Sequence, residues 1–198
     1  MADPLYLSLW FPSFDHEEML TRSAAVMREF PSSPVRPGIT YISVHPIAWT
    51  EPTVLERRFN QRISPEEAVD LMSEFLYDDY AFVFEAFWDL WAPQDDLSLP
   101  WIQRPIAVRF IVHGKQFEEG LYTDRGHLEI DFGLDTPFLH DELDLTPFMA
   151  ERVKFNVAKL IDFSQRLEQN CALSGRLLWS ESEENLAQKL VARLQTTQ

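Results

Sequence analysis

The stretch YAFVFEAFWDLW, residues 80–91, is the densest apolar run of the chain, and its secondary structure decides the fold. As a strand, the run has one wholly apolar face, while Glu85 and Asp89 lie on the opposite face. As a helix, it has an equally clean apolar stripe that continues the helical pattern before it. The many aromatic residues, and the break at Asp78 and Asp79, favour a strand. We therefore predict a strand about 40 Å long, with a bend or bulge within it, and keep the helix as the alternative.

Helix signals surround this run. The clearest is the segment SPEE, residues 64–67, where serine, proline and glutamate stand at the positions of a capping box. Apolar residues recur at helical spacing after it, up to residue 76. Similar caps and stripes predict three further helices, at about residues 15–30, 146–170 and 186–194.

Several other segments alternate as strands do. They are residues 5–11, 39–49, 106–113, 116–121, 127–132 and 177–179, with a weaker pattern at 49–59. Short connections between consecutive strands indicate antiparallel pairing. We predict a single α+β domain over residues 1–198, with a mostly antiparallel sheet and four helices packed largely on one face. Its β-α-β start loosely suggests a ferredoxin-like arrangement.

Composition limits the classes of partner. The chain has 198 residues, is 45% hydrophobic and carries a formal net charge of −15. This excess of carboxylates argues against binding nucleic acid or an anionic membrane, because phosphate contacts need lysine and arginine. A basic protein partner fits better, and so does a surface charge that simply maintains solubility.

The carboxylates are concentrated in two segments. Residues 63–103 hold ten acidic residues and no lysine or arginine, and residues 126–151 hold seven and again no base. If the two segments lie side by side, they form an anionic surface that could bind a basic partner; the alternative is a solvated surface. The residues that we select for such contacts, partly from the exposed acidic loop expected at 134–146, are Asp95, Asp96, Asp141, Glu142 and Asp144.

Cysteine content and the N-terminus indicate the compartment. Cys171 is the single cysteine, so the chain has no internal disulfide, which suits a reducing environment. We expect a structural buried thiol there rather than a nucleophile. The first apolar run is too short for a signal peptide or a membrane span. We therefore expect a cytoplasmic protein.

Two groups of polar residues on predicted strands are candidates for a binding site. His127, Glu129 and Asp131 alternate along one strand and lie about 6.6 Å apart, so they could bind a divalent cation or act as acid and base; a strand face that meets water has the same pattern. Glu85 and Asp89 lie among large apolar residues, where a carboxylate needs a partner, and we expect Arg109 on the neighbouring strand to supply one. A ligand-binding polar patch and ordinary solvation are the alternatives. The predicted cleft consists of Glu85, Asp89, Arg109, His127, Glu129 and Asp131.

The long helix at 146–170 has a second face that is both basic and aromatic. Arg152, Phe155 and Lys159 lie on it, flanked by further phenylalanines. This face could pack inside the chain, against a second copy in a homodimer, or against another protein.

Catalytic motifs are absent from the sequence. It has no G-x-S-x-G, no H-E-x-x-H and no glycine-rich phosphate loop, and its histidines are not spaced as metal ligands. We therefore expect no cofactor and no metal, and our first hypothesis is a non-catalytic interaction protein, such as an inhibitor or immunity-type module, that binds a basic partner. The second is a small-ligand binder or hydrolase-type enzyme that uses the predicted cleft. A third is a structural component that assembles with copies of itself.

Overall fold

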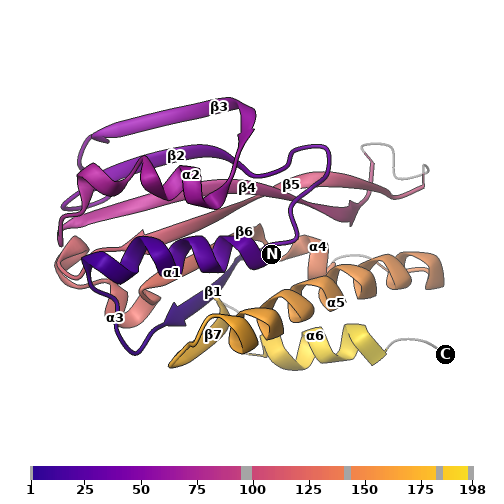
Figure 1. The fold of residues 1–198 in the computed structure, drawn as a ribbon. Coiled ribbons are helices and arrows are strands. Elements are labelled where there is room, and N and C mark those ends of the chain that lie inside the picture. Colours follow the sequence, from indigo (N-terminus) through magenta and orange to yellow (C-terminus); the bar gives the residue numbers. More distant parts are fainter. Residues whose placement is uncertain (1, 95–99, 141–143, 182–184, 196–198) are drawn as a thin grey trace.

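The computed structural model describes residues 2–94, 100–140, 144–181 and 185–195 (Figure 1). Its described strands form one sheet of seven in the order β3-β2-β4-β5-β6-β1-β7, and every neighbouring pair is antiparallel. The strands are β1 Pro4–Trp10, β2 Ile39–Pro46, β3 Leu55–Ile63, β4 Tyr80–Ala92, β5 Ile102–His113, β6 Leu128–Leu134 and β7 Gly175–Ser180. The α-helices are α1 His16–Glu29, α2 Pro65–Asp70, α3 Tyr122–Arg125, α4 Thr136–Leu139, α5 Pro147–Asn170 and α6 Leu186–Gln195.

The mixed α+β architecture and its antiparallel sheet confirm the predicted fold class in outline. The helix count does not: the described residues form six α-helices, because the short α3 lies in the connection between two predicted strands and the short α4 lies in a predicted loop. The ferredoxin-like start is not confirmed either. β4, β5 and β6 separate β1 from β2, since β1 pairs with β6 and β7 from the C-terminal half of the chain. Within the described part of the chain, no helix is both long and apolar enough to cross a membrane.

The run at 80–91 is a strand, as predicted. β4 pairs with β5 in unbroken register, from Ala81 opposite His113 to Ala92 opposite Ile102. The bulge predicted within this strand is wrong, because β4 has no extra residue; instead β2 shifts register between Ile39 and Tyr41, opposite an uninterrupted stretch of β4. The extra residue is therefore placed in the shorter strand, and the long strand keeps its alternation.

An aromatic cluster fills the space between the sheet and the helices. Trp88 of β4 is fully buried and contacts Phe30 at 5.5 Å, Phe132 at 5.3 Å and Phe163 at 6.5 Å between ring centroids. Phe30 follows α1 and Phe163 belongs to α5, so both helices cover the same face of the sheet (Figure 1). Burial of this cluster is the main apolar contribution to the fold.

β4 extends beyond its partner β2, and other elements pair the backbone groups along its free edge. The amide nitrogen of Ser33 donates to the carbonyl of Phe87 at 2.6 Å, and Lys159 Nζ donates to the carbonyl of Asp89 at 3.0 Å. Asn156 of α5 accepts from the amide of Trp91 at 2.9 Å and donates to its carbonyl at 2.8 Å. The side chain of Asn156 thus replaces a neighbouring strand, which protects an edge that could otherwise pair with another chain.

Replacing Asn156 by alanine is expected to lower the free energy of unfolding by about 2–4 kcal/mol, because it leaves the buried polar groups of Trp91 without partners. Asn156 is fully buried and also donates to the carbonyl of Pro137 at 2.8 Å. Denaturant unfolding of the variant tests this, with the exposed Gln165→Ala of the same helix as the matched control. Equal stability of the two variants would contradict the role given to Asn156.

Two segments differ from the sequence prediction because local turns override a short pattern. Residues 116–121 were expected to form a strand, but a 3-10 helix, Phe117–Glu119, turns the chain there and is followed by α3. Glu118 and Glu119 adopt left-handed backbone conformations, with φ of 48° and 57°, which a strand does not contain. Phe117 is instead fully buried against Trp49 and His113.

The loop at 134–146 was expected to be exposed and acidic, but its first part is packed. α4 lies within it, and Asp135 and His140 are buried. Burial lowers the pKa of His140 to about 4, so this histidine is neutral near pH 7. Its ring contacts that of Trp101 at 4.7 Å, and Trp101 is also buried.

The helix predicted after residue 64 begins as expected but is shorter. Ser64 and Glu67 form the reciprocal capping box, and Pro65 is the first residue of α2. The helix ends at Asp70, and a 3-10 turn, Ser73–Phe75, follows it.

Candidate functional site

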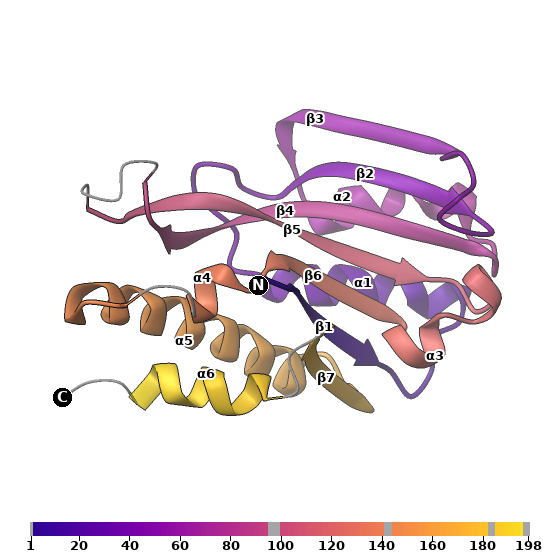
Figure 2. The same ribbon diagram turned by 180° about the vertical axis from the view of Figure 1, so that it is seen from behind.

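The helices leave one face of the sheet open. In Figure 2, β2, β4 and β5 lie in front of α1 and α2, and no described helix crosses them. Strand register aligns one row of side chains across this side, from Tyr41 through Glu85, Arg109, Asp131 and Tyr6 to Trp179. We call this side, defined by that row, the uncovered face. It contains five members of the predicted cleft, namely Glu85, Asp89, Arg109, Glu129 and Asp131.

Glu85 and Arg109 form the predicted ion pair. They are cross-strand neighbours, and Arg109 Nε lies 3.6 Å from Glu85 Oε2. The side chain of Glu85 is 10% exposed and that of Arg109 is 57% exposed. A buried carboxylate is thus neutralised by a cation that keeps much of its hydration, an arrangement that avoids most of the cost of burying two charges.

Replacing Arg109 by methionine is expected to reduce the free energy of unfolding by about 1 kcal/mol, since it leaves Glu85 without a cation while the lost pair was partly screened by water. The double variant Glu85→Gln, Arg109→Met should recover much of this loss. Urea unfolding of the two single variants and the double variant gives the coupling energy. A coupling energy of zero would show that the two side chains do not stabilise each other.

Glu129 lies in the adjacent row and is only 6% exposed. Its Oε2 is 3.7 Å from Nη1 of Arg125. Burial raises the pKa of Glu129 to about 7; Arg125 lowers it in part, and Asp131 raises it further. Burial outweighs the nearby cation here, because the guanidinium approaches only at the limit of ion-pair distance. Glu129 can therefore hold a proton near neutral pH.

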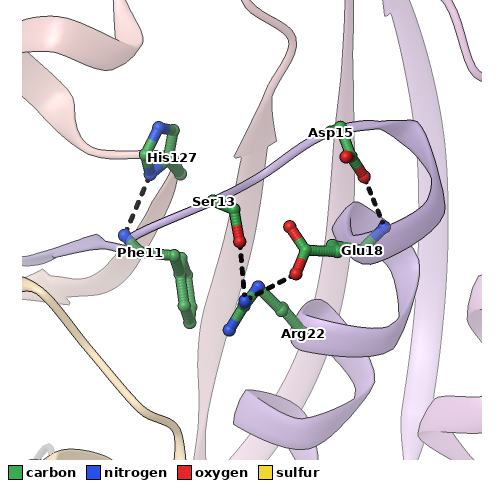
Figure 3. Close-up of polar contacts among 6 residues, drawn as sticks. All are labelled: Phe11, Ser13, Asp15, Glu18, Arg22 and His127. Carbon is green, nitrogen blue, oxygen red and sulfur yellow. Dashed lines mark hydrogen bonds and ion pairs between the residues drawn. The ribbon is translucent and has the colours of Figure 1, made fainter.

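His127, the remaining member of the predicted cleft, lies just before β6 and contacts the connection between β1 and α1. Nδ1 of His127 accepts a hydrogen bond from the amide of Phe11 at 3.0 Å (Figure 3). The ring of His127 also stacks on those of Phe14 and Tyr122. His127 thus holds the connection between β1 and α1. Asp89 follows Glu85 along β4 near its free edge, where its backbone carbonyl accepts from Lys159.

The same connection explains how α1 begins. Asp15 accepts from the amide of Glu18 at 3.1 Å, as the capping pattern predicts. Arg22 donates to both Glu18, at 2.8 Å, and Ser13, at 3.1 Å (Figure 3). These contacts stabilise the start of α1. His127, beside them, is in contact with Phe11, Phe14 and Tyr122.

Three arginine–aromatic stacks on the uncovered face were not predicted from the sequence. Arg125 lies 4.4 Å from the ring centroid of Trp179 and 5.7 Å from that of Tyr6, which itself stacks on Trp179 at 4.6 Å. The other two stacks join Arg58 to Tyr41 at 4.8 Å and Arg36 to Phe87 at 4.7 Å. Each stack joins residues from different elements, so only their residue types were visible in the sequence.

The residues predicted for partner contacts are dispersed. Arg152 lies over Trp91 at 3.9 Å and over Phe148 at 4.5 Å, and Lys159 donates to β4, so the basic side of α5 packs in part inside the chain. Phe155 of the same helix is 48% exposed, and Asp144 is exposed. The remaining predicted contacts, Asp95, Asp96, Asp141 and Glu142, lie outside the described residues.

Comparison of the chain with protein-family models, with curated proteins and with solved structures finds no match.

Proposed function

We propose that this chain is a non-catalytic interaction module that binds a basic protein partner through the uncovered face. The observation that carries the proposal is the set of three arginine–aromatic stacks distributed across that face. Tryptophan, tyrosine and arginine dominate the energetically important positions of protein interfaces. The stacks also hold these side chains in place before binding, which reduces the entropy lost on association.

The charge of the whole chain acts while the partner approaches, whereas the side chains of the uncovered face act once the two proteins are in contact. Thirty-two acidic residues against 17 bases attract a basic partner over long range and raise the association rate. The face itself carries both signs, with Glu85, Arg109 and Asp131 aligned in its central row. Long-range charge thus favours encounter, whereas the stacked residues supply most of the contact energy.

The experiment that tests this proposal is a pull-down with the tagged chain from a lysate of its source organism, at low and moderate salt. We expect a basic protein in one-to-one stoichiometry, with weaker capture at higher salt. Trp179→Ala and Tyr6→Ala should each weaken binding of the purified partner by about tenfold or more.

Tyr77→Ala is the matched control, because Tyr77 is an aromatic residue, 54% exposed, that precedes β4 and is not part of the row across the uncovered face. Unfolding curves confirm that each variant is folded. Loss of binding by Tyr77→Ala but not by Trp179→Ala would overturn the assignment of the face. Self-association of the isolated chain, measured by sedimentation, would favour the homodimer instead.

The raised pKa of Glu129 favours a second candidate, a small-ligand binder or hydrolase-type enzyme at the same face. A carboxyl with a pKa of about 7 exchanges protons readily at neutral pH, as catalytic acids and bases do. A thermal-shift screen of small ligands, repeated with Glu129→Gln, tests it: a ligand whose effect requires the carboxyl would support this candidate over a protein partner.

A further inference from the structure

We propose that a hollow at the β3 end of the uncovered face binds a doubly charged oxyanion, namely the phosphoryl group of a small phosphate monoester. The hollow has a volume of about 340 Å³ and lies where β2 begins and β3 ends. Arg36 contributes to its wall from the connection between α1 and β2, and Arg58 and Arg62 contribute from β3. Three arginines from two separate segments thus line one space of small-molecule size.

These three arginines have no carboxylate partner among the described residues. By contrast, Arg22, Arg28, Arg109, Arg125, Arg166 and Arg176 each have an ion pair. Hydrogen bonds with Ser64 lower the pKa of Glu67 and the charge of Arg62 adds to that shift, but no carboxylate within the described part of the chain lies within 4.0 Å of Arg62. The three side chains are exposed, so water solvates their charges when no ligand is present, and their positive charge around one hollow favours an anionic ligand.

Two of the three are held in place by aromatic rings. Arg36 stacks on Phe87 and Arg58 stacks on Tyr41. An aromatic ring that attracts the charge of a guanidinium leaves N–H donors of that group for other acceptors, such as an oxyanion. Phosphate and carboxylate oxygens accept such paired donors well, and three cations favour a dianion over a monoanion.

The one acidic side chain among the residues that line the hollow is already neutralised. Glu85 borders it, but its carboxylate pairs with Arg109. The positive charge of Arg36, Arg58 and Arg62 therefore acts on a ligand without a competing free carboxylate in the wall. Asn60 and Thr40 also line the hollow and bring further polar atoms to it.

The strand itself offers a matched control. Arg57 precedes Arg58 in β3, so alternation places the two side chains on opposite faces. Register supports this, because Arg57 is opposite the buried Ile42 whereas Arg58 is opposite Tyr41. Arg57→Gln and Arg58→Gln remove the same charge from adjacent positions, but only the second removes it from the hollow.

The test is an NMR titration of the full chain with inorganic phosphate at pH 7.5 and constant ionic strength, following the arginine Nε–Hε signals. We expect saturable shifts of the signals of Arg36, Arg58 and Arg62. Arg58→Gln and Arg62→Gln should weaken phosphate binding by about tenfold, whereas Arg57→Gln should bind as the wild type does.

Linear shifts without saturation, or equal weakening by Arg57→Gln and Arg58→Gln, would mean non-specific ion attraction and would overturn the proposal. Acetate at the same concentration distinguishes a dianion site from a general carboxylate site, and equal affinity for both ions would also overturn it. The inference does not depend on the proposed protein partner, because Trp179→Ala should leave phosphate binding unchanged.

Discussion

Trp88→Ala is expected to lower the free energy of unfolding by about 3–5 kcal/mol, the largest loss from any single substitution considered for this chain. Trp88 is fully buried in β4, in contact with Phe30, which follows α1, and with rings from α5 and β6. Its removal leaves a cavity between the sheet and both helices that a rigid strand cannot close. Denaturant unfolding by circular dichroism measures the change at constant m-value.

Trp88→Phe separates ring packing from the indole N–H. Nε1 of Trp88 is buried and has no acceptor among the described residues. Phenylalanine keeps most ring contacts and removes this unpaired donor, so its cost should be well below that of alanine. Phe155→Ala, at an exposed aromatic position, should change stability by less than about 0.5 kcal/mol. An alanine variant at position 88 as stable as Phe155→Ala would contradict the described core.

Glu129→Gln is expected to gain stability relative to the wild type as pH rises from about 4.5 to 7. Burial raises the pKa of Glu129 from 4.5 to about 7 in the folded chain. In that pH range the folded state binds one more proton than the unfolded state, so wild-type stability falls as pH rises. At about 1.4 kcal/mol for each pKa unit, the change is at most about 3 kcal/mol. Glutamine does not titrate, so the Glu129→Gln variant does not lose stability in this way as pH rises.

The measurement is the difference in unfolding free energy between the variant and the wild type at pH 4.5, 6 and 8. Other titrating groups cancel in this difference, including His113, whose pKa burial lowers to about 4. Asp124→Asn, at an exposed carboxyl of α3, is the control and should show a flat difference. A flat difference for Glu129→Gln as well would mean that the carboxyl ionises in the folded chain as it does in water.

Much of the fold was predictable from the sequence because its signals are local. Side-chain caps at Asp15, Ser64 and Thr146 start three helices as their spacing indicates, and the alternation of β4 predicted its strand. The strand predicted at 116–121 was wrong, because weak alternation over six residues cannot exclude a turn. There the burial of Phe117 and two left-handed residues determine the backbone.

The candidate site was only partly predictable because sheet order depends on distant pairings. Glu85 and Arg109 lie on consecutive strands, so their pairing followed from alternation alone. Trp179 meets Tyr6 because the last strand pairs with the first, which no local pattern indicates. The same applies to Arg36, which reaches the uncovered face through a connection rather than through a strand.

The central claim is that the uncovered face is a binding surface. The most direct test is hydroxyl-radical footprinting of the chain alone and in complex with the captured partner. We expect lower oxidation of Tyr6, Tyr41 and Trp179 in the complex, and unchanged oxidation of Tyr77 and Phe155, which are exposed at other elements. Protection of Tyr77 or Phe155, with Tyr6, Tyr41 and Trp179 oxidised as in the free chain, would contradict the claim.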